Sequence, residues 1–245
     1  MYLRDEEIQL DDGQIGIVRV TDSAACCKKA LEQKMAVLAL LTQENREEDF
    51  TGVLYACEDP AAIDTEFLMK VYQRYHGLPW EILTTERCLV RETTEADVDS
   101  FYEMYADPQI TRYTEGLFPE REKERQYVRD YIRNVYSFYG FGIWTILDRR
   151  TGAVIGRAGL TMREGFEDPE IGFVIASHRQ REGLATEVCG AILEYGRTEL
   201  EFQKIRALVL PDNTASLKLC DRLGMRDEEE ITVGGVRYLQ RSVTF

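Results

Sequence analysis

Residues 170–186 read Glu170-Ile171-Gly172-Phe173-Val174-Ile175-Ala176-Ser177-His178-Arg179-Gln180-Arg181-Glu182-Gly183-Leu184-Ala185-Thr186. This stretch begins as a short apolar strand, continues through a polar loop and ends where a helix begins. Because Gly183 and Ala185 are small, they leave the backbone N–H groups of the first helical turn uncovered. The unpaired N–H groups and the positive end of the helix dipole attract anions, so this turn is suited to a pyrophosphate.

A second strand-to-helix unit follows further along the chain. Lys204 to Leu210 reads as a buried strand, and Pro211-Asp212-Asn213 reads as a turn ending in a helix cap. Thr214 to Leu223 is then a short helix, which Gly224 closes. Both segments, 170–186 and 204–224, thus consist of an apolar strand followed by the start of a helix.

The segment from Arg87 to Phe245 is predicted to contain both helices and strands in one domain. Gly234-Gly235 indicates a tight hairpin near the end, because both turn positions need positive φ. The expected order is a strand at 88–91, helices at 95–106 and 120–138, strands at 141–147, 153–161 and 170–176, a helix from 183, a strand at 204–210, a helix at 214–223 and a hairpin over 231–239.

These features resemble the GNAT acyltransferases. Gln180 to Ala185 fits the pattern Arg/Gln-x-x-Gly-x-Gly/Ala, which grips the pyrophosphate of coenzyme A in that family. Asn213, Ser216, Leu219 and Gly224-Met225 resemble the second GNAT signature, Asn-x-x-Ala/Ser-x-x-Leu/Tyr with a Gly-aromatic ending. The resemblance implies an α/β (α+β) fold with a mixed, mostly antiparallel central sheet flanked by helices. It also implies acetyl-CoA as cosubstrate and no metal.

Within the superfamily, the chain resembles the Rim-type branch, which includes the ribosomal-protein alanine acetyltransferases. The segments that carry this likeness are 86–92, the connection 107–111 and 170–173. The branch also contains enzymes that act on antibiotics, polyamines and other small amines. The resemblance therefore implies an amine acceptor, either a protein N-terminus or a small cationic molecule.

The resemblance also implies which residues contact coenzyme A. Arg179, Arg181, Lys218 and Arg222 are placed to offset its negative charge, although arginines on helix surfaces are usually only solvated. The implied contacts are the strand backbone at Val174, Ile175 and Ala176, the loop and helix start at Gln180, Arg181, Glu182, Gly183, Leu184, Ala185 and Thr186, and the second motif at Asn213 and Ser216.

Two residues are candidates for the catalytic roles. Glu170 resembles the glutamate that takes the proton of the amine in many relatives, and its alternative is a solvated carboxylate at the start of a strand. Strand alternation puts Glu170 on the same face as small residues, which predicts room for a ligand there. Cys220 occupies the position of the usual acid, a tyrosine, so it either protonates the leaving thiolate or is a buried structural cysteine.

The acceptor is expected to enter between the two early helices and the sheet. Tyr113, Phe118, Tyr139 and Trp144 are candidates for its pocket, and each is equally suited to the core.

Composition limits the remaining function classes. The formal net charge of −14 disfavours binding of nucleic acids and anionic membranes and favours binding of cationic acceptors. The alternative is that the acidic surface only keeps the protein soluble. The longest apolar run, Met35 to Leu41, is too short to cross a membrane. The six cysteines form no C-x-x-C pair and only two histidines are present, so we expect no zinc site, reduced thiols and a cytoplasmic protein.

Residues 1–82 are expected to form a separate small α/β domain of unknown role, and residues 83–245 the GNAT domain. Strands at 15–20, 35–41 and 53–57 and helices at 24–34 and from Asp64 predict a three-stranded parallel sheet, with 80–85 as a linker. Such a domain has little core, so we expect it to pack against the transferase half or in a homodimer. The alternative function is a non-catalytic acyl-CoA sensor whose first domain binds a partner.

Overall fold

The computed structural model describes residues 2–10 and 12–245. The chain divides into two compact units, Met1–Trp80 and Glu81–Phe245. Each unit contains its own β-sheet, of four strands in the first unit and eight in the second.

The sheet of the first unit is mixed, with the order β1-β2-β3-β4. Its strands are β1 (Leu3–Gln9), β2 (Ile15–Thr21), β3 (Ala36–Leu40) and β4 (Tyr55–Cys57). β2, β3 and β4 run parallel, whereas β1 pairs with β2 as an antiparallel hairpin. The three predicted strands are thus present and parallel, whereas the fourth strand, β1, was not predicted. β1 has the polar sequence LRDEEIQ and buries only Ile8, so it shows no apolar pattern.

Two helices cover opposite faces of this sheet. α1 (Ala24–Glu32) is capped by Ser23 and packs through Cys27 and Ala30 against Val37 and Ala39 of β3. On the other face, α2 (Thr65–Tyr75) packs through Leu68 and Val71 against alternate residues of β2 and β3. A single-turn helix, η1 (Pro60–Ala62), precedes α2. β3 is buried along its whole length between these two helices.

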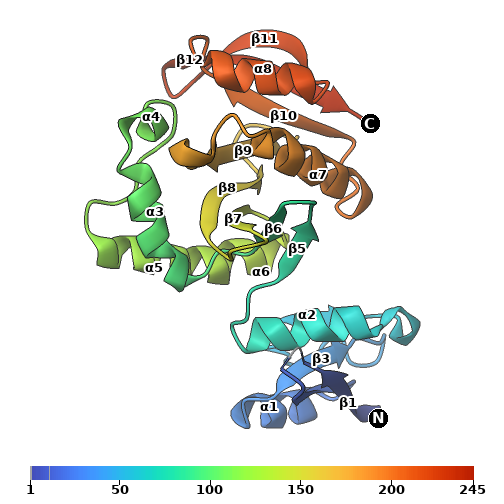
Figure 1. The fold of residues 1–245 in the computed structure, drawn as a ribbon. Helices are drawn as coiled ribbons and strands as arrows, with labels where there is room; N and C mark the ends of the chain where they lie inside the picture. The colour runs from blue at the N-terminus through green and yellow to red at the C-terminus, as the bar shows by residue number, and fades with distance from the viewer. Residues whose placement is uncertain (1, 11) are drawn as a thin grey trace. The chain divides into compact units, whose positions relative to one another are not determined.

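The second unit is built on an eight-stranded sheet with the order β11-β12-β10-β9-β8-β7-β6-β5 (Figure 1). Every neighbouring pair is antiparallel except β9 and β10, which run parallel. This confirms the expected mixed, mostly antiparallel sheet. The strands are β5 (Glu81–Thr84), β6 (Cys88–Arg91), β7 (Ile143–Asp148), β8 (Val154–Thr161), β9 (Glu170–Ile175), β10 (Lys204–Val209), β11 (Arg226–Val233) and β12 (Val236–Thr244).

The helices of the second unit are more divided than the sequence pattern predicts. The helix expected at 95–106 is a 3-10 turn followed by α3, and the helix expected at 120–138 contains a π-helical segment. Residues 81–84 form an edge strand instead of a linker, and Asp107 caps a further short helix, α4. The bounds are η2 (Glu95–Asp97), α3 (Val98–Tyr105), α4 (Pro108–Thr111), α5 (Arg121–Tyr131), η3 (Ile132–Tyr136), α6 (Ser137–Tyr139), η4 (Ser177–Arg179), α7 (Leu184–Thr198) and α8 (Thr214–Arg222).

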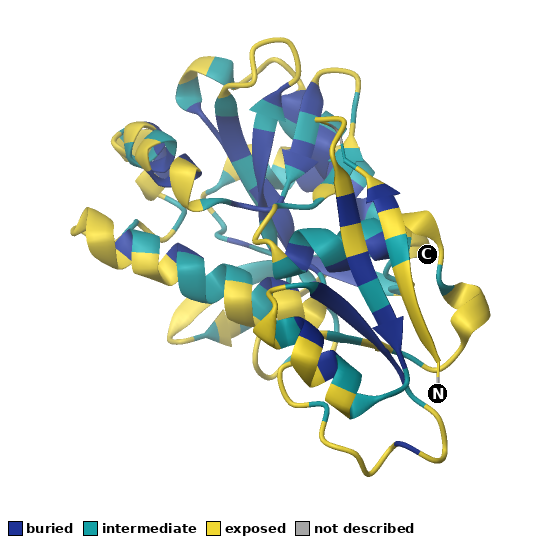
Figure 2. Ribbon diagram, turned by 90° about the horizontal axis from the view of Figure 1, so that it is seen from below, coloured by how far each residue is buried: buried dark blue, intermediate teal, exposed yellow. Residues whose placement is uncertain are grey.

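The core of the second unit lies between its sheet and α7. Val188 and Ile192 of α7 are fully buried against strand residues such as Ile146 and Ile205. Figure 2 shows buried residues along the strands and on the inner faces of the helices, whose outer faces are exposed. Neither unit has, within its described residues, a helix long and apolar enough for a membrane span.

Candidate active site

The parallel strands β9 and β10 are in register at one position, where Glu170 is paired with Arg206. β9 is paired with β8 along its whole length, and β10 with β12 likewise. The two parallel strands therefore separate beyond Glu170, and each turns an edge toward the gap. Ligands of α/β sheets commonly bind at the carboxyl ends of such strands.

A cavity of about 170 Å³ occupies this gap. It brings together five residues that the sequence singled out, namely Tyr113, Glu170, Asn213, Ser216 and Cys220. The rest of its lining comes from the loop after α4, from β9 and β10, from the two following helices and from the residues that follow α8: Thr114, Ile171, Gly172, Phe173, Cys189, Ala207, Leu208, Val209, Leu210, Leu219, Leu223, Met225 and Tyr238.

α7 follows β9 after η4 and a short loop, and its start has no side-chain cap. Its N-cap residue is Gly183, with φ +84°, and no side chain accepts a hydrogen bond from the backbone N–H groups of the first turn. By contrast, Asn213 caps α8 by accepting from the N–H of Ser216 at 3.2 Å. The N–H groups of Leu184, Ala185 and Thr186 are thus left without a side-chain cap in the described residues, as an anion site requires. The loop therefore fits the pyrophosphate of coenzyme A.

Arg87, for which the sequence indicates no role, holds this helix start in place. Its Nε donates to Oε2 of Glu187, in the first turn of α7, at 2.7 Å. Its Nη1 donates to the backbone carbonyl of Glu182 at 2.8 Å. Arg87 thus joins the beginning of β6 to the loop and to α7. Its only signal in the sequence was its place in the segment 86–92.

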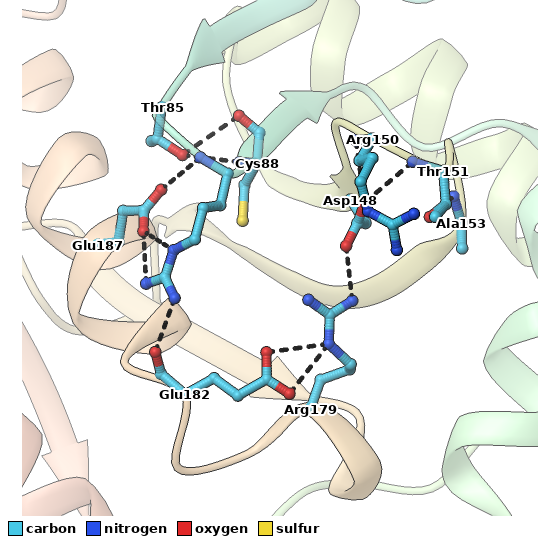
Figure 3. A network of polar contacts seen from close by, with 10 residues as sticks. Thr85, Cys88, Asp148, Arg150, Thr151, Ala153, Arg179, Glu182 and Glu187 are labelled. Atoms are coloured by element: carbon cyan, nitrogen blue, oxygen red, sulfur yellow. Dashed lines mark hydrogen bonds and ion pairs between the residues drawn. The ribbon is translucent and has the colours of Figure 1, made fainter.

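Arg179 and Asp148 hold the other side of the loop (Figure 3). Arg179 Nη1 donates to Asp148 Oδ2 at 2.8 Å, and Arg179 Nε donates to the Glu182 carboxylate at 3.1 Å. Asp148 also accepts from the backbone N–H groups of Arg150 and Thr151 in the turn after β7. The hydrogen bond from Arg179 lowers the pKa of Asp148 to about 2. Arg179 is thus paired with two carboxylates of the chain, although its position in the sequence predicts a place beside coenzyme A.

The remaining predicted cofactor residues lie in the loop before α7 and at the end of β9. Gln180 uses its side-chain amide to donate to the carbonyl of Ile175 at 2.9 Å, which fixes the end of β9. Arg181 has a left-handed backbone, with φ +66°. The side chains of Val174 and Ala176 pack against Phe101 and Met104 of α3, so this part of the strand face is filled. The face that was expected to have room for a ligand therefore borders the cavity at Glu170 and Gly172 and is filled at Val174 and Ala176.

Both carboxylate oxygens of Glu170 accept hydrogen bonds from Arg163. Nε donates to Oε2 at 2.6 Å and Nη2 donates to Oε1 at 3.1 Å. Glu170 borders the cavity as one half of an ion pair, so it is not simply a solvated carboxylate at the start of a strand. Its role as a base stays a prediction.

Cys220 is buried in the cavity wall on α8. Burial raises the pKa of its thiol to about 11, so the thiol is protonated at neutral pH. Proton transfer from this thiol to an ordinary thiolate, of pKa about 8.5, is unfavourable. The structure therefore favours the reading of Cys220 as a structural cysteine.

Of the four aromatic candidates for the acceptor pocket, only Tyr113 lines the cavity, and its hydroxyl donates to the carbonyl of Asp212 at 3.3 Å. Phe118 lies against Tyr127, outside the cavity. Tyr139 packs beside the exposed ring of Phe138.

Trp144 is a core residue and is removed from the acceptor candidates. Its side chain is fully buried and meets Tyr195 of α7 edge to face. Alternation along β7 points it into the core. Tyr238, in contrast, lines the cavity from β12, which only the pairing of β12 with β10 reveals.

No three acidic, histidine or cysteine side chains form a metal-binding group in residues 2–10 and 12–245. All six cysteines are free.

Comparisons with known proteins agree with this architecture. The family model of the acetyltransferase (GNAT) domain matches residues 87–226. The N-acetyltransferase YnaD of Bacillus subtilis is 31% identical over 147 residues, which cover 60% of this chain and 83% of YnaD.

Two solved structures share the fold. A GNAT-family acetyltransferase from Bacillus anthracis has a TM-score of 0.57 at 24% identity and covers 66% of this chain and 97% of its own. The ribosomal L7/L12 alpha-N-protein acetyltransferase RimL, solved with coenzyme A, has a TM-score of 0.57 at 14% identity and covers 67% of this chain and 98% of its own. The chain therefore belongs to the GNAT acetyltransferases and uses acetyl-CoA as its cosubstrate.

Proposed function

We propose that the protein transfers the acetyl group of acetyl-CoA to a primary amine, on a protein N-terminus or on a small cationic molecule. The observation that carries this proposal is the cavity between β9 and β10. Each of these strands leads to the start of a helix, β9 to α7 and β10 to α8. A thioester arm can enter there with its pyrophosphate at α7 and its acetyl group in the cavity.

In this proposal the chain binds coenzyme A mainly through its backbone. The N–H groups after Gly183 hold the pyrophosphate, and the edge of β9 at Val174, Ile175 and Ala176 pairs with the pantetheine arm. Arg87 and Arg179 act indirectly, because their hydrogen bonds to Glu182 hold the loop in position. Asn213 and Ser216 form the opposite wall of the cavity.

The acceptor amine must lose a proton to attack the thioester. Glu170 is the proposed proton acceptor, since it borders the cavity and each carboxylate oxygen retains a second lone pair beside its bond from Arg163. The same carboxylate attracts the ammonium form of the acceptor. Proton uptake by Glu170 would weaken its ion pair with Arg163, so we expect Arg163 to affect the rate as well.

The experiment is an assay of thiol release from acetyl-CoA with a panel of peptides and small amines, together with detection of the acetylated product by mass spectrometry. Acetylation of at least one primary amine, above the rate of thiol release without acceptor, is expected. Tight binding of acetyl-CoA with no product from any amine would contradict the proposal and point to a sensor.

A further inference from the structure

Arg206 is a buried cation whose charge the chain leaves incompletely satisfied. Its side chain is 2% exposed, in the middle of β10. Nε and Nη2 of its guanidinium are buried and have no hydrogen-bond partner anywhere in residues 2–10 and 12–245. The carboxylates of Glu170 and Asp168 offset part of its charge but form no hydrogen bond with these two nitrogens. Burial of guanidinium nitrogens without hydrogen bonds is unfavourable, and a bound ligand would explain why the chain retains them.

The two unpaired nitrogen atoms are on the same edge of the guanidinium. Nε and Nη2 form the side-on fork that binds both oxygens of a carboxylate. The ring of Phe166 lies over the guanidinium, with its centroid 3.6 Å from Cζ, and fixes the plane of the fork. The geometry is therefore that of a carboxylate clamp.

Arg206 lines an open groove of about 520 Å³ between the loop before β9 and the β11–β12 hairpin. The groove also contains the carboxylates of Glu167, Asp168 and Glu229. These three would repel a dianion such as a phosphate ester, whereas they would attract a ligand that carries an amine. A molecule with both a carboxylate and an ammonium group fits this combination of charges.

The groove adjoins the cavity of the transferase site. Arg206 and Glu170 are register partners on neighbouring strands, so their side chains lie on the same face of the sheet. Glu170 lines the cavity and Arg206 lines the groove. A ligand can therefore extend from one to the other across a single pair of residues.

We propose that Arg206 binds a carboxylate of the acceptor, so that the preferred substrate is an amine that also carries a carboxylate. The source is either an acidic side chain near a peptide N-terminus or the acid group of a small amino acid. This inference rests on the proposed acetyl transfer, and it adds a specificity residue on the acceptor side of the site.

The test compares matched acceptors with acetyl-CoA and the full-length protein. Short peptides that differ only by Glu or Gln at the second, third or fourth position form one set. Glutamate, 4-aminobutyrate and their amides form the other, which distinguishes the two sources. We expect the wild type to prefer a carboxylate over its amide by roughly 10- to 100-fold in kcat/KM, as for one or two charge-assisted hydrogen bonds.

Two variants and one control assign the preference to Arg206. Arg206→Gln should remove it by raising KM for the carboxylate acceptor far more than KM for the amide acceptor. Arg206→Lys keeps the charge but loses the fork, so it should retain part of the preference and guards against a folding defect. Arg237→Gln removes an exposed arginine of the same hairpin and should leave the preference intact.

Calorimetry with the same Glu and Gln peptides, on protein saturated with coenzyme A, gives a readout that needs no turnover. Tighter binding of the Glu peptide to wild type than to Arg206→Gln supports the clamp even if no amine in the panel is acetylated. Absence of acetylation alone would refute only the proposed acetyl transfer. Equal binding and equal rates for carboxylate and amide, or a preference that survives in Arg206→Gln, would overturn the inference.

Discussion

At the scale of single residues, Gly183 shows how one backbone angle can determine an anion site. Its φ of +84° places it in the left-handed region, where a side chain adds strain. A Cβ at this position would lie 3.6 Å from Nη2 of Arg87, an ordinary contact, so space alone does not require glycine. Glycine serves here because it leaves the first turn of α7 accessible.

Gly183→Asp should weaken acetyl-CoA binding by roughly 10- to 100-fold, because it adds strain and a negative charge where the pyrophosphate binds. Calorimetric titration measures the effect. Gly77→Asp is a matched control, since Gly77 also has positive φ and open space but lies in the first unit. Unchanged affinity in Gly183→Asp would remove this loop from the cofactor site.

Glu170→Gln tests the proposed base. It should keep the affinity for acetyl-CoA and lower turnover by roughly 10²-fold or more, the usual range for a lost general base. Arg163→Gln serves as the companion variant, because it frees the Glu170 carboxylate without removing it. Full activity of Glu170→Gln from pH 6 to 9 would show that the amine arrives neutral and needs no base.

Cys220→Ala should leave kcat within a few-fold of wild type, because burial raises the pKa of the thiol to about 11 and makes it a poor proton donor to a thiolate of pKa about 8.5. Some loss of stability is expected, because replacing the buried thiol side chain by a methyl group leaves a small void in the core. A fall of 100-fold or more in kcat, with acetyl-CoA affinity and folding retained, would instead identify Cys220 as the general acid.

At the scale of elements, the order of strands and helices in the second unit could be predicted from local signals. Apolar runs, the Gly234-Gly235 turn and the Asn213 cap are all visible in the sequence. β1 could not be predicted, since its stability comes from pairing with β2 and not from its own polar residues. The ion pairs of Glu170 and of Asp148 were also missed, because they join residues that only the fold brings together.

Asp148→Asn should loosen the connection between the β7–β8 turn and the cofactor loop. The native pKa of Asp148, about 2, lies below the unfolded value of about 3.8, so its contribution to stability is present above pH 4 and is lost as the pH falls toward 2. The difference in unfolding midpoint between wild type and Asp148→Asn should therefore shrink across that range.

Asp130→Asn is the control, because it removes an exposed ion pair on α5 and should change the midpoint little at any pH. A difference between wild type and Asp148→Asn that stays constant from pH 7 to 2 would contradict the assignment of the low pKa to this pair.

At the scale of the whole molecule, every residue proposed to bind coenzyme A belongs to the second unit, Glu81–Phe245. We therefore expect the first unit to influence acceptor choice, assembly or solubility, and not the cofactor site. A chain that begins at Glu81 keeps β5 whole, whereas one that begins at Leu83 would cut this strand.

If the chain from Glu81 folds, as circular dichroism would show, its affinity for acetyl-CoA should match that of the full protein. Its acceptor range or subunit number is expected to differ. A folded truncated chain that no longer binds acetyl-CoA would show that the first unit contributes to the cofactor site.

The single register pair between β9 and β10 also has a mechanical consequence. It divides the sheet into two parts, β5-β6-β7-β8-β9 and β10-β12-β11, which are paired with each other at a single register position. A pantetheine arm bound along β9 would fill the gap between the two parts of the sheet and connect them while acetyl-CoA is bound. Amide hydrogen exchange should then slow in both β9 and β10 when acetyl-CoA binds. Bound acetyl-CoA would therefore stabilise the sheet of the enzyme as well as serve as its substrate.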